Sequence, residues 1–217
     1  MKMSDKCLRV TSGYIALLAL YFGNAVFGDK SATLFDEVVK CAPLLFLGAI
    51  VAMEHYRGAR LLAAALLLSV VGDWAGERGW FLAQAGSFMA AHVAFALYFL
   101  RRTKVDAAGV VLSVALVAIG IATEILLLPH IGSIAERVMC GGYIVAIIAM
   151  AVSAIMRQGV WRWGGAAAAM LFVLSDGCIA WNRFVEPLPY AGVWIMTTYF
   201  AAQYIFAIIG LKESEAK

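Results

Sequence analysis

Charged residues are scarce in this chain: aspartate, glutamate, lysine and arginine together make up 14% of its 217 residues. This is roughly half of the share that is usual in soluble domains. Hydrophobic residues make up 64%, and a soluble fold of this length has too little interior to bury so many apolar side chains. The composition therefore excludes a compact water-soluble enzyme and a disordered chain, and it predicts an integral membrane protein.

Histidines and paired cysteines, the usual ligands of zinc, are also sparse. The three histidines, His55, His92 and His130, fall near the inner end, in the middle and near the outer end of the predicted membrane spans. The four cysteines include no Cys-x-x-Cys pair, and neither a Gly-x-Ser-x-Gly nor a His-Glu-x-x-His motif is present. We therefore expect no metal site and no cofactor, and any chemistry has to depend on carboxylates.

A basic stripe is missing as well. The formal net charge is +3, but the basic residues are scattered over short loops. A nucleic-acid partner is not expected from this pattern, and the expected partner of the surface is the lipid bilayer.

What the sequence does contain is a series of apolar segments of about 20 residues, the length that a helix needs to cross a bilayer. The eight segments are 11–27, 34–53, 59–77, 80–101, 106–128, 134–156, 161–183 and 190–211. Backbone polar groups in lipid have to bond within their own segment, so all eight should be helices. Segment 34–53 contains Asp36, Glu37, Lys40 and Pro43, so seven spans are the alternative. The predicted fold class is all-α: a polytopic membrane bundle of about eight transmembrane helices, forming a single domain over residues 1–217.

Lysine and arginine are distributed unevenly between the two predicted sides of the membrane. The side that holds both termini carries twelve: Lys2, Lys6, Arg9, Arg57, Arg60, Arg101, Arg102, Lys104, Arg157, Arg162, Lys212 and Lys217. The opposite side carries five: Lys30, Lys40, Arg78, Arg137 and Arg183. Because positively charged loops stay in the cytoplasm, we expect both termini to be cytoplasmic, in a multi-pass protein of a bacterial inner membrane.

The two halves of the chain, about 11–101 and 106–211, are faintly similar. An even number of helices in each half predicts parallel repeats, although chance similarity among alanine-rich helices is the alternative. The matching pairs are Gly72-Asp73 with Ser175-Asp176, and Phe88-Met-Ala-Ala-His92 with Tyr199-Phe-Ala-Ala-Gln203.

Two aspartates lie inside apolar segments, where a carboxylate costs several kcal/mol and usually faces the bundle interior for a functional reason. At a rise of ~1.5 Å per residue, Asp73 lies about 21 Å along its helix from Ala59, and Asp176 lies about 22 Å along its helix from Trp161. Both therefore fall in the half of the bilayer away from the cytoplasm. Hydrogen bonding between helices without catalysis is the alternative.

Other polar side chains share these helix faces or this depth. Ser69, Gly72 and Asp73 lie on one small and polar stripe, which permits close approach of another helix or a substrate. Lys40 is the expected counter-ion of one carboxylate, with snorkelling to the interface as the alternative. The further candidates are His92, Asn182, Arg183, Tyr199 and Gln203. The alternative for Tyr199 and Gln203 is packing and ordinary hydrogen bonding, and for His92 it is a satisfied core histidine. For Arg183 the alternative is an aqueous ion pair at the membrane rim.

The order of these residues resembles the YhhN family, which includes the transmembrane lysoplasmalogenases of animals. The resemblance extends from about residue 34 to 211. It is carried by Lys40-Cys-Ala-Pro43, Ser69-Val-Val-Gly72-Asp73, the Phe81, Gly86, Phe88 and His92 run, Tyr143, Leu174-Ser175-Asp176, Asn182-Arg183-Phe184, Tyr199 and Gln203. The sequence departs from many relatives at Trp74-Ala-Gly76-Glu77, where they continue with apolar residues, and this affects the expected shape of the acyl-chain pocket.

The resemblance implies a lysoplasmalogenase. Such an enzyme cleaves the vinyl-ether bond of a membrane lysophospholipid (lysoplasmenyl-ethanolamine or -choline) to a fatty aldehyde and glycerophospho-ethanolamine or -choline. The chemistry needs an acid that protonates carbon near neutral pH, and burial near a second carboxylate favours the protonated form of a carboxyl group in general. We expect Asp73 and Asp176 to be the acid/base pair, oriented by His92, Tyr199 and Gln203. The lipid phosphate would lie near Arg183 or Lys40.

Two other classes of function are compatible with the same residues. A proton-coupled lipid or small-solute transporter would use the buried carboxylates to carry protons, and parallel halves suit alternating access. A non-catalytic membrane scaffold would tolerate Asp73→Asn and Asp176→Asn together and lose only stability.

Overall fold

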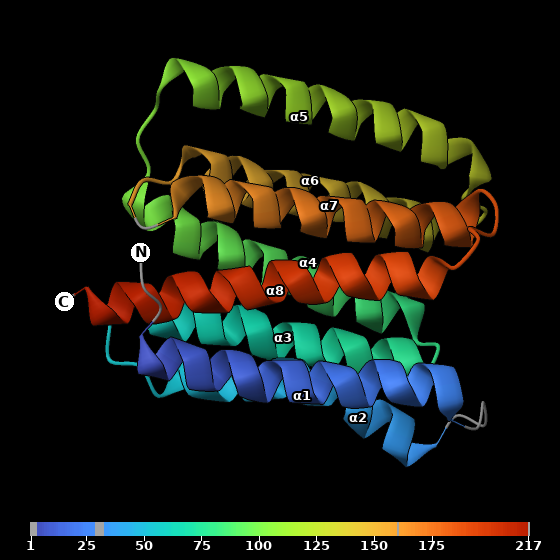
Figure 1. Cartoon of the computed structure of the whole chain (residues 1–217). Helices are drawn as coiled ribbons and strands as arrows, with labels where there is room; N and C mark the ends of the chain where they lie inside the picture. The colour runs from blue at the N-terminus through green and yellow to red at the C-terminus, as the bar shows by residue number, and fades with distance from the viewer. Residues whose placement is uncertain (1–3, 29–32, 160, 217) are drawn as a thin grey trace.

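The computed structural model describes residues 4–28, 33–159 and 161–216, and this part of the chain folds into eight α-helices (Figure 1). The helices are α1 (Asp5–Phe27), α2 (Leu34–Ala52), α3 (Ala59–Glu77), α4 (Phe81–Phe99), α5 (Ala107–Leu127), α6 (Ile134–Met156), α7 (Arg162–Phe184) and α8 (Ala191–Glu215). Two short 3-10 turns, η1 (Leu100–Arg102) and η2 (Leu128–His130), follow α4 and α5. The prediction of an all-α polytopic bundle is confirmed. Lys2, Lys30 and Lys217, which contributed to the charge count, lie outside the described residues.

Seven of the helices in the described ranges are long and apolar enough to cross a membrane. The exception is α2, whose N-terminal half carries Asp36, Glu37 and Lys40, as the sequence led us to expect. Its first turn is fixed by Thr33 and Asp36, which form a reciprocal capping box. Pro43 lies inside α2, where it lacks the N–H that would bond to the preceding turn.

Helix α1 begins six residues before the predicted span, and α8 ends four residues beyond its predicted span. The Ser4 side chain accepts a hydrogen bond from the Cys7 amide at 3.1 Å and caps α1 at this early position. The Ser4 hydroxyl also donates to Glu215 near the end of α8. Both extensions therefore lie at the polar end of the bundle, where helices can continue beyond the hydrocarbon.

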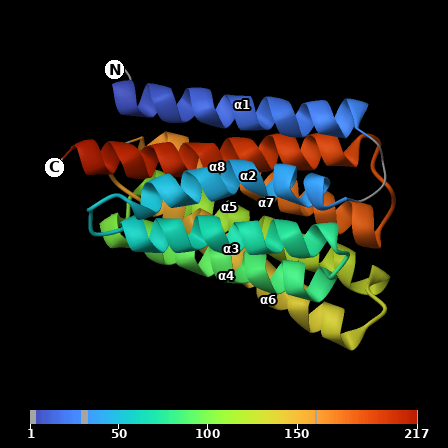
Figure 2. The same ribbon diagram turned by 90° about the horizontal axis from the view of Figure 1, so that it is seen from below.

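The helices run roughly along one common direction, and both termini lie at the same end of the bundle (Figure 1). Helix α5 lies at one edge, where it packs mainly against α6. Helix α1 lies on the opposite side and packs against α2 (Figure 2). Helices α3 with α4 and α7 with α8 are the closest antiparallel pairs.

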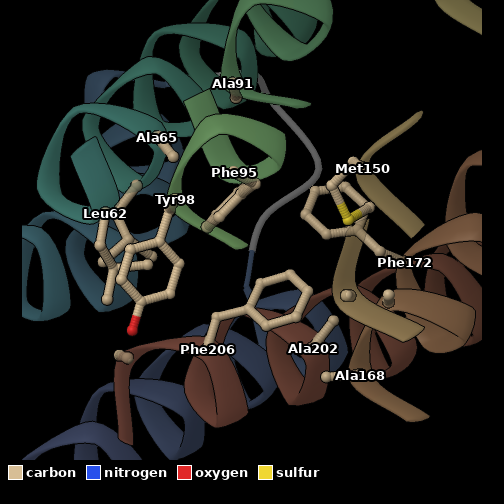
Figure 3. Packing of buried hydrophobic residues seen from close by; sticks show 14 of the residues in the cluster. Leu62, Ala65, Ala91, Phe95, Tyr98, Met150, Ala168, Phe172, Ala202 and Phe206 are labelled. Atoms are coloured by element: carbon tan, nitrogen blue, oxygen red, sulfur yellow. The ribbon is translucent and has the colours of Figure 1, made fainter. Parts of the chain in front are cut away.

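The centre of the bundle is filled by aromatic rings from α4, α7 and α8 (Figure 3). The ring of Phe95 lies 4.9 Å from that of Phe206, and Phe99 lies 5.0 Å from Phe206, measured between centroids. Phe172 of α7 is fully buried beside them. Small residues such as Ala91, Ala168 and Ala202 are also fully buried and let the helices approach closely.

Large apolar side chains cover the outside as well. On α5, Val111 is 68% exposed and Ile125 is 66% exposed. In water such a surface would be unfavourable, whereas in a bilayer it contacts lipid. The protein is therefore a multi-pass membrane protein with a polar interior at selected depths.

Candidate active site

Asp176 of α7 is the centre of a three-residue hydrogen-bonded cluster in the outer half of the bundle, away from the termini. Its Oδ2 accepts a bond of 2.6 Å from the Tyr143 hydroxyl on α6 and lies 3.0 Å from Nε2 of His92 on α4. His92 Nε2 is also 3.0 Å from the Tyr143 hydroxyl. His92 is fully buried, and the side chain of Asp176 is 8% exposed. Side chains of α4 and α6 thus hold one carboxylate oxygen of α7.

Asp73 of α3 belongs to a second cluster, formed with α8. The Tyr199 hydroxyl donates a bond of 2.8 Å to Asp73 Oδ2. One turn toward the termini, Gln203 Nε2 donates to Ser69 Oγ at 2.9 Å, and Ser69 donates to the carbonyl of Ala65. All four side chains of this cluster are buried, so Asp73 faces the bundle interior.

One aromatic ring lies between the two clusters. The Phe172 ring is 4.7 Å from the His92 ring and 5.4 Å from the Tyr199 ring, measured between centroids. On the other side, Phe88 packs edge-on against Tyr199 at 5.8 Å. Within the described residues, the two carboxyl groups make no hydrogen bond to each other, and aromatic side chains separate them.

Asp176 lies on a groove between α4, α6 and α7, which contains about 530 Å³ of space not filled by atoms, including its open mouth. The lining is apolar apart from a few groups, of which Asp176, Tyr143 and Gln84 are the most polar. Its apolar residues are Phe81, Ala85, Phe88, Leu127, Met139, Ile144, Ile179, Ala180 and Phe184. An apolar hollow with a few polar groups at one place is the usual form of a small-molecule site. Asp73 does not line this groove.

A second hollow reaches Asp176 from the side of α5. It contains about 490 Å³ including its open part, and it is lined by Gly120 and Thr123 of α5 together with Val173 and Gly177 of α7. Both hollows share Asp176 and Tyr143. The carboxylate is therefore reached from two apolar sides of the bundle.

Three predicted site residues lie at the outer rim and not against the aspartates. Lys40 Nζ pairs with Glu77 Oε1 at 2.6 Å, so the carboxylate that it contacts is Glu77. One turn of α3 separates Glu77 from Asp73, and Glu77 lies nearer water. The Asn182 carboxamide oxygen accepts from the Leu188 amide and caps the α7–α8 loop. Arg183 pairs with Glu136 at 2.7 Å.

Arg183 nevertheless lies beside the groove. Its guanidinium carbon is 3.8 Å from the centroid of the Phe81 ring and 5.4 Å from that of Phe184, and both rings line the groove. Its side chain is 41% exposed. A positive charge therefore lies at the outer rim, on aromatic rings whose other atoms form the groove.

Two residues near Asp176 could not be identified by motif: Phe172, which lies between the two clusters, and Gln84, which lines the groove. Phe172 occupies the central place between His92 and Tyr199, but in the sequence it is one phenylalanine in an apolar run. Gln84 lies one helical turn before Phe88, and this spacing is the only sequence signal for it. As for metal binding, the described ranges hold no group of three or more histidine, cysteine or acidic residues placed to bind an ion.

Comparison with known proteins gives consistent matches over most of the chain. The model of the YhhN family matches residues 35–209. The lysoplasmalogenase TMEM86B of Sus scrofa is 36% identical over 211 residues, covering 91% of this chain and 84% of that protein. The lysoplasmalogenase TMEM86B of Homo sapiens is 30% identical over 228 residues, covering 98% and 91% of the two chains.

A bacterial relative matches as well. The lysoplasmalogenase of Mycobacterium bovis is 34% identical over 171 residues, which cover 75% of this chain and 64% of that protein. No solved structure matches the fold. Because the family model covers well over half of the chain and two vertebrate relatives align with nearly all of it, this protein belongs to the YhhN family.

Proposed function

We propose that this protein is a membrane hydrolase that cleaves the vinyl-ether bond of lysoplasmalogens, releasing a fatty aldehyde and a glycerophospho-ethanolamine or -choline. The observation that carries the proposal is the place of Asp176: a carboxyl group held by Tyr143 and His92 on an otherwise apolar groove of a YhhN protein. The relatives named lysoplasmalogenase support the substrate class.

The groove suits a single-chain lipid. The alkenyl chain would lie among apolar side chains such as Phe88, Ile144 and Ile179, and the phosphate would lie at the outer rim near Arg183. Arginine forms paired hydrogen bonds with phosphate oxygens, which favours this end for the head group. The substrate is therefore expected to enter sideways from the outer leaflet.

The reaction can be assigned to the free oxygen of Asp176. Both of the described partners, Tyr143 and His92, bond to Oδ2, which leaves Oδ1 to face the substrate. As an acid, Asp176 gives its proton to the β-carbon of the vinyl ether, and the α-carbon and ether oxygen share the resulting positive charge. A water molecule then attacks the α-carbon and returns a proton to the carboxylate. The hemiacetal breaks its bond to the glycerol oxygen, which takes up the hydroxyl proton, and the aldehyde leaves.

Asp73 remains the second member of the proposed pair, acting at a distance from the groove. The Tyr199 hydroxyl donates to its carboxyl group, and the Phe172 ring lies between this cluster and that of Asp176. In so apolar an interior the field of an ionised carboxylate extends over several ångströms. Asp73 would then stabilise the positive charge that forms in the groove.

The test is aldehyde release by purified protein from three lysolipids that differ only in the chain linkage: vinyl ether, alkyl ether and acyl ester. We expect aldehyde from the vinyl ether alone, identified by mass spectrometry. Asp176→Asn should lower kcat by about 10²- to 10⁴-fold, the usual contribution of a general acid. Glu186→Gln, which removes an exposed carboxylate at the same end of the molecule, is the matched control and should leave kcat unchanged.

Two results would contradict the proposal. One is full activity in a folded Asp176→Asn protein. The other is the absence of any product together with lipid or solute flux that follows a proton gradient in proteoliposomes, which would indicate a transporter. We further propose that the membrane is a bacterial cytoplasmic membrane, with both termini on the cytoplasmic side, on the basis of the lysine and arginine distribution.

A further inference from the structure

A second cavity lies at the opposite end of the bundle from Asp176, near both termini. It contains about 840 Å³ including its open part, and no residue of the proposed active site lines it. Its walls come from the α2–α3 loop, the end of α4 with η1, the end of α6, and α8. The lining residues are Tyr56, Arg57, Gly58, Tyr98, Arg101, Arg102, Arg157 and Glu213.

Positive charge is in excess in this cavity. Four arginines line it together with one acidic residue, Glu213. Glu213 is already engaged: it pairs with Arg157, accepts a bond of 3.0 Å from the Tyr98 hydroxyl, and lies 3.8 Å from Arg102 Nε. The neighbouring Glu54 is paired with Lys6. Because Glu213 and Glu54 already have partners, the guanidinium groups of Arg57 and Arg101 have no counter-charge among the groups that line the cavity.

The backbone holds Arg102 and Arg157 in place. Segments 102–104 and 156–158 lie side by side, with the Gln158 amide bonded to the Arg102 carbonyl at 2.7 Å and the Lys104 amide bonded to the Met156 carbonyl at 3.1 Å. Arg157 is 1% exposed, which is a costly position for a cation unless anions surround it. The charges of Arg102 and Arg157 are therefore fixed in the cavity wall by the backbone and by burial.

The start of α3 adds to the positive potential. Gly58 is the N-cap of this 19-residue helix and supplies no capping side chain. A Cβ at Gly58 would lie 3.0 Å from Arg101 Nη1 and 3.0 Å from the Tyr98 ring, so glycine permits a guanidinium group to approach the helix N-terminus. The N-terminus of α3 and the guanidinium group of Arg101 are both positive, and an anion that binds between them stabilises both.

We infer that this cavity is a binding site for a phosphate group, held chiefly by Arg57 and Arg101. Arginine forks fit phosphate oxygens, and basic pockets between the cytoplasmic ends of transmembrane helices bind anionic lipid head groups. The same chemistry would accept the head group of a phospholipid or a soluble phosphate compound. The site is separate from the groove at Asp176, so its occupant is not the substrate.

The test measures thermal unfolding of the full-length protein in a neutral detergent. One arm adds inorganic pyrophosphate, with sodium chloride of equal ionic strength as its control. The other adds dioctanoyl phosphatidic acid, with dioctanoyl phosphatidylcholine as its control. A saturating ligand should raise Tm by several degrees, about 5 °C for a chain of this size. A shift with pyrophosphate assigns a soluble phosphate ligand, and a shift with phosphatidic acid alone assigns a lipid head group.

The matched variants are Arg57→Gln/Arg101→Gln and Arg60→Gln. The double variant should weaken binding ~100-fold, because each of its two lost charged hydrogen bonds lowers affinity ~10-fold. Arg60 is an exposed arginine at the same end of the bundle outside the cavity, so Arg60→Gln should respond like the unmodified protein. If the double variant does not fold, Arg101→Gln alone should bind ~10-fold more weakly.

The inference is overturned if neither phosphate compound shifts Tm beyond its control. It is equally overturned if the arginine variants of the cavity respond as strongly as Arg60→Gln.

Discussion

At the scale of single residues, the Tyr143 hydroxyl fixes the orientation of the Asp176 carboxyl group. It makes the shortest of the contacts in the cluster, 2.6 Å to Oδ2, and lies 3.0 Å from His92 Nε2. One hydroxyl therefore fixes both the carboxyl group and the imidazole. With Oδ2 held in this way, Oδ1 points to a constant place, which is the main requirement for proton transfer to carbon.

Tyr143→Phe should fold and lose about 10-fold or more in kcat toward a vinyl-ether lysolipid, because the carboxyl group is no longer held in one orientation. Loss of the buried hydrogen bonds should also cost about 1–3 kcal/mol of stability. Both are measured on the purified protein, by aldehyde release and by thermal unfolding. Tyr190→Phe is the control, since Tyr190 is 81% exposed. Unchanged kcat in Tyr143→Phe would show that the hydroxyl does not orient the acid.

At the scale of helices, α3 and α4 approach closely where Gly72 faces an aromatic ring. A Cβ at Gly72 would lie 2.8 Å from Phe88 Cε2, closer than real contacts allow. Phe88 in turn lines the groove and packs on Tyr199. The absence of a side chain at position 72 thus sets the position of a groove wall beside Asp73.

Gly72→Ala should therefore displace the Phe88 ring, lower stability by about 1–3 kcal/mol and raise KM for the lysolipid. Gly23→Ala is the control, since a Cβ there meets nothing within 4 Å and alanine favours a helix. Thermal unfolding and substrate titration of both variants test this. If the two substitutions change Tm and KM equally, the contact between position 72 and Phe88 does not determine the shape of the groove.

Helices α5 and α7 are joined at the end near the termini by one charged contact. The Asp106 side chain caps α5 by accepting from the Gly109 amide at 2.7 Å, and its Oδ2 pairs with Arg162 Nη1 at 2.5 Å. The hydrogen bond from Arg162, followed by that from the Gly109 amide, lowers the pKa of Asp106 from 3.8 to about 2. This ion pair fixes the N-terminal end of α5 to α7; elsewhere α5 packs mainly against α6.

Because the pKa of Asp106 is lower in the folded than in the unfolded protein, its ionised form stabilises the fold above about pH 4, and this contribution is lost as the pH falls toward 2. Asp106→Asn keeps a capping side chain but loses the charge. Its Tm should be lower than that of the unmodified protein at pH 7, and the difference should narrow between pH 4 and pH 3. A difference that stays constant over this range would contradict the assignment.

At the scale of the whole molecule, the two clusters are related in a regular way. Asp73 of the first half bonds to Tyr199 of the second, and Asp176 of the second half bonds to His92 of the first. The residues one turn earlier follow the same exchange: Ser69 contacts Gln203, and Phe172 contacts His92. In the alignment of the two halves the contact Ser69–Gln203 matches Phe172–His92, whereas Tyr199 matches Phe88 and not His92, so the parallel repeats over residues 11–101 and 106–211 stay a prediction.

The position of both termini at one end of the bundle (Figure 1) leads to a topological prediction. With the cytoplasmic orientation favoured by the basic residues, a green fluorescent protein fused after Lys217 should fluoresce in cells, and alkaline phosphatase fused there should be inactive. Fusion of each reporter after Gly79, in the α3–α4 turn at the other end, should give the reverse result. Active phosphatase at the C-terminus would invert the proposed orientation.

The sequence by itself determined the fold class, the helix segments and the places of the two aspartates along their helices. The physical reason is that lipid obliges each apolar segment to satisfy its own backbone hydrogen bonds, so length and local composition are sufficient to locate the helices. The segment that is least suited to cross the membrane, α2, was also identified from the sequence, because it carries three charged residues in its first two turns.

Only the tertiary structure decided which polar groups meet. Tyr143 bonds to Asp176, Tyr199 bonds to Asp73, and Lys40 pairs with Glu77. These choices depend on the rotation and the axial offset of one helix against another, and a change of a single residue in that offset would bring different side chains together. The arginine cavity near the termini, like the groove at Asp176, arises where elements distant in sequence meet, so its position follows from packing and not from any local motif.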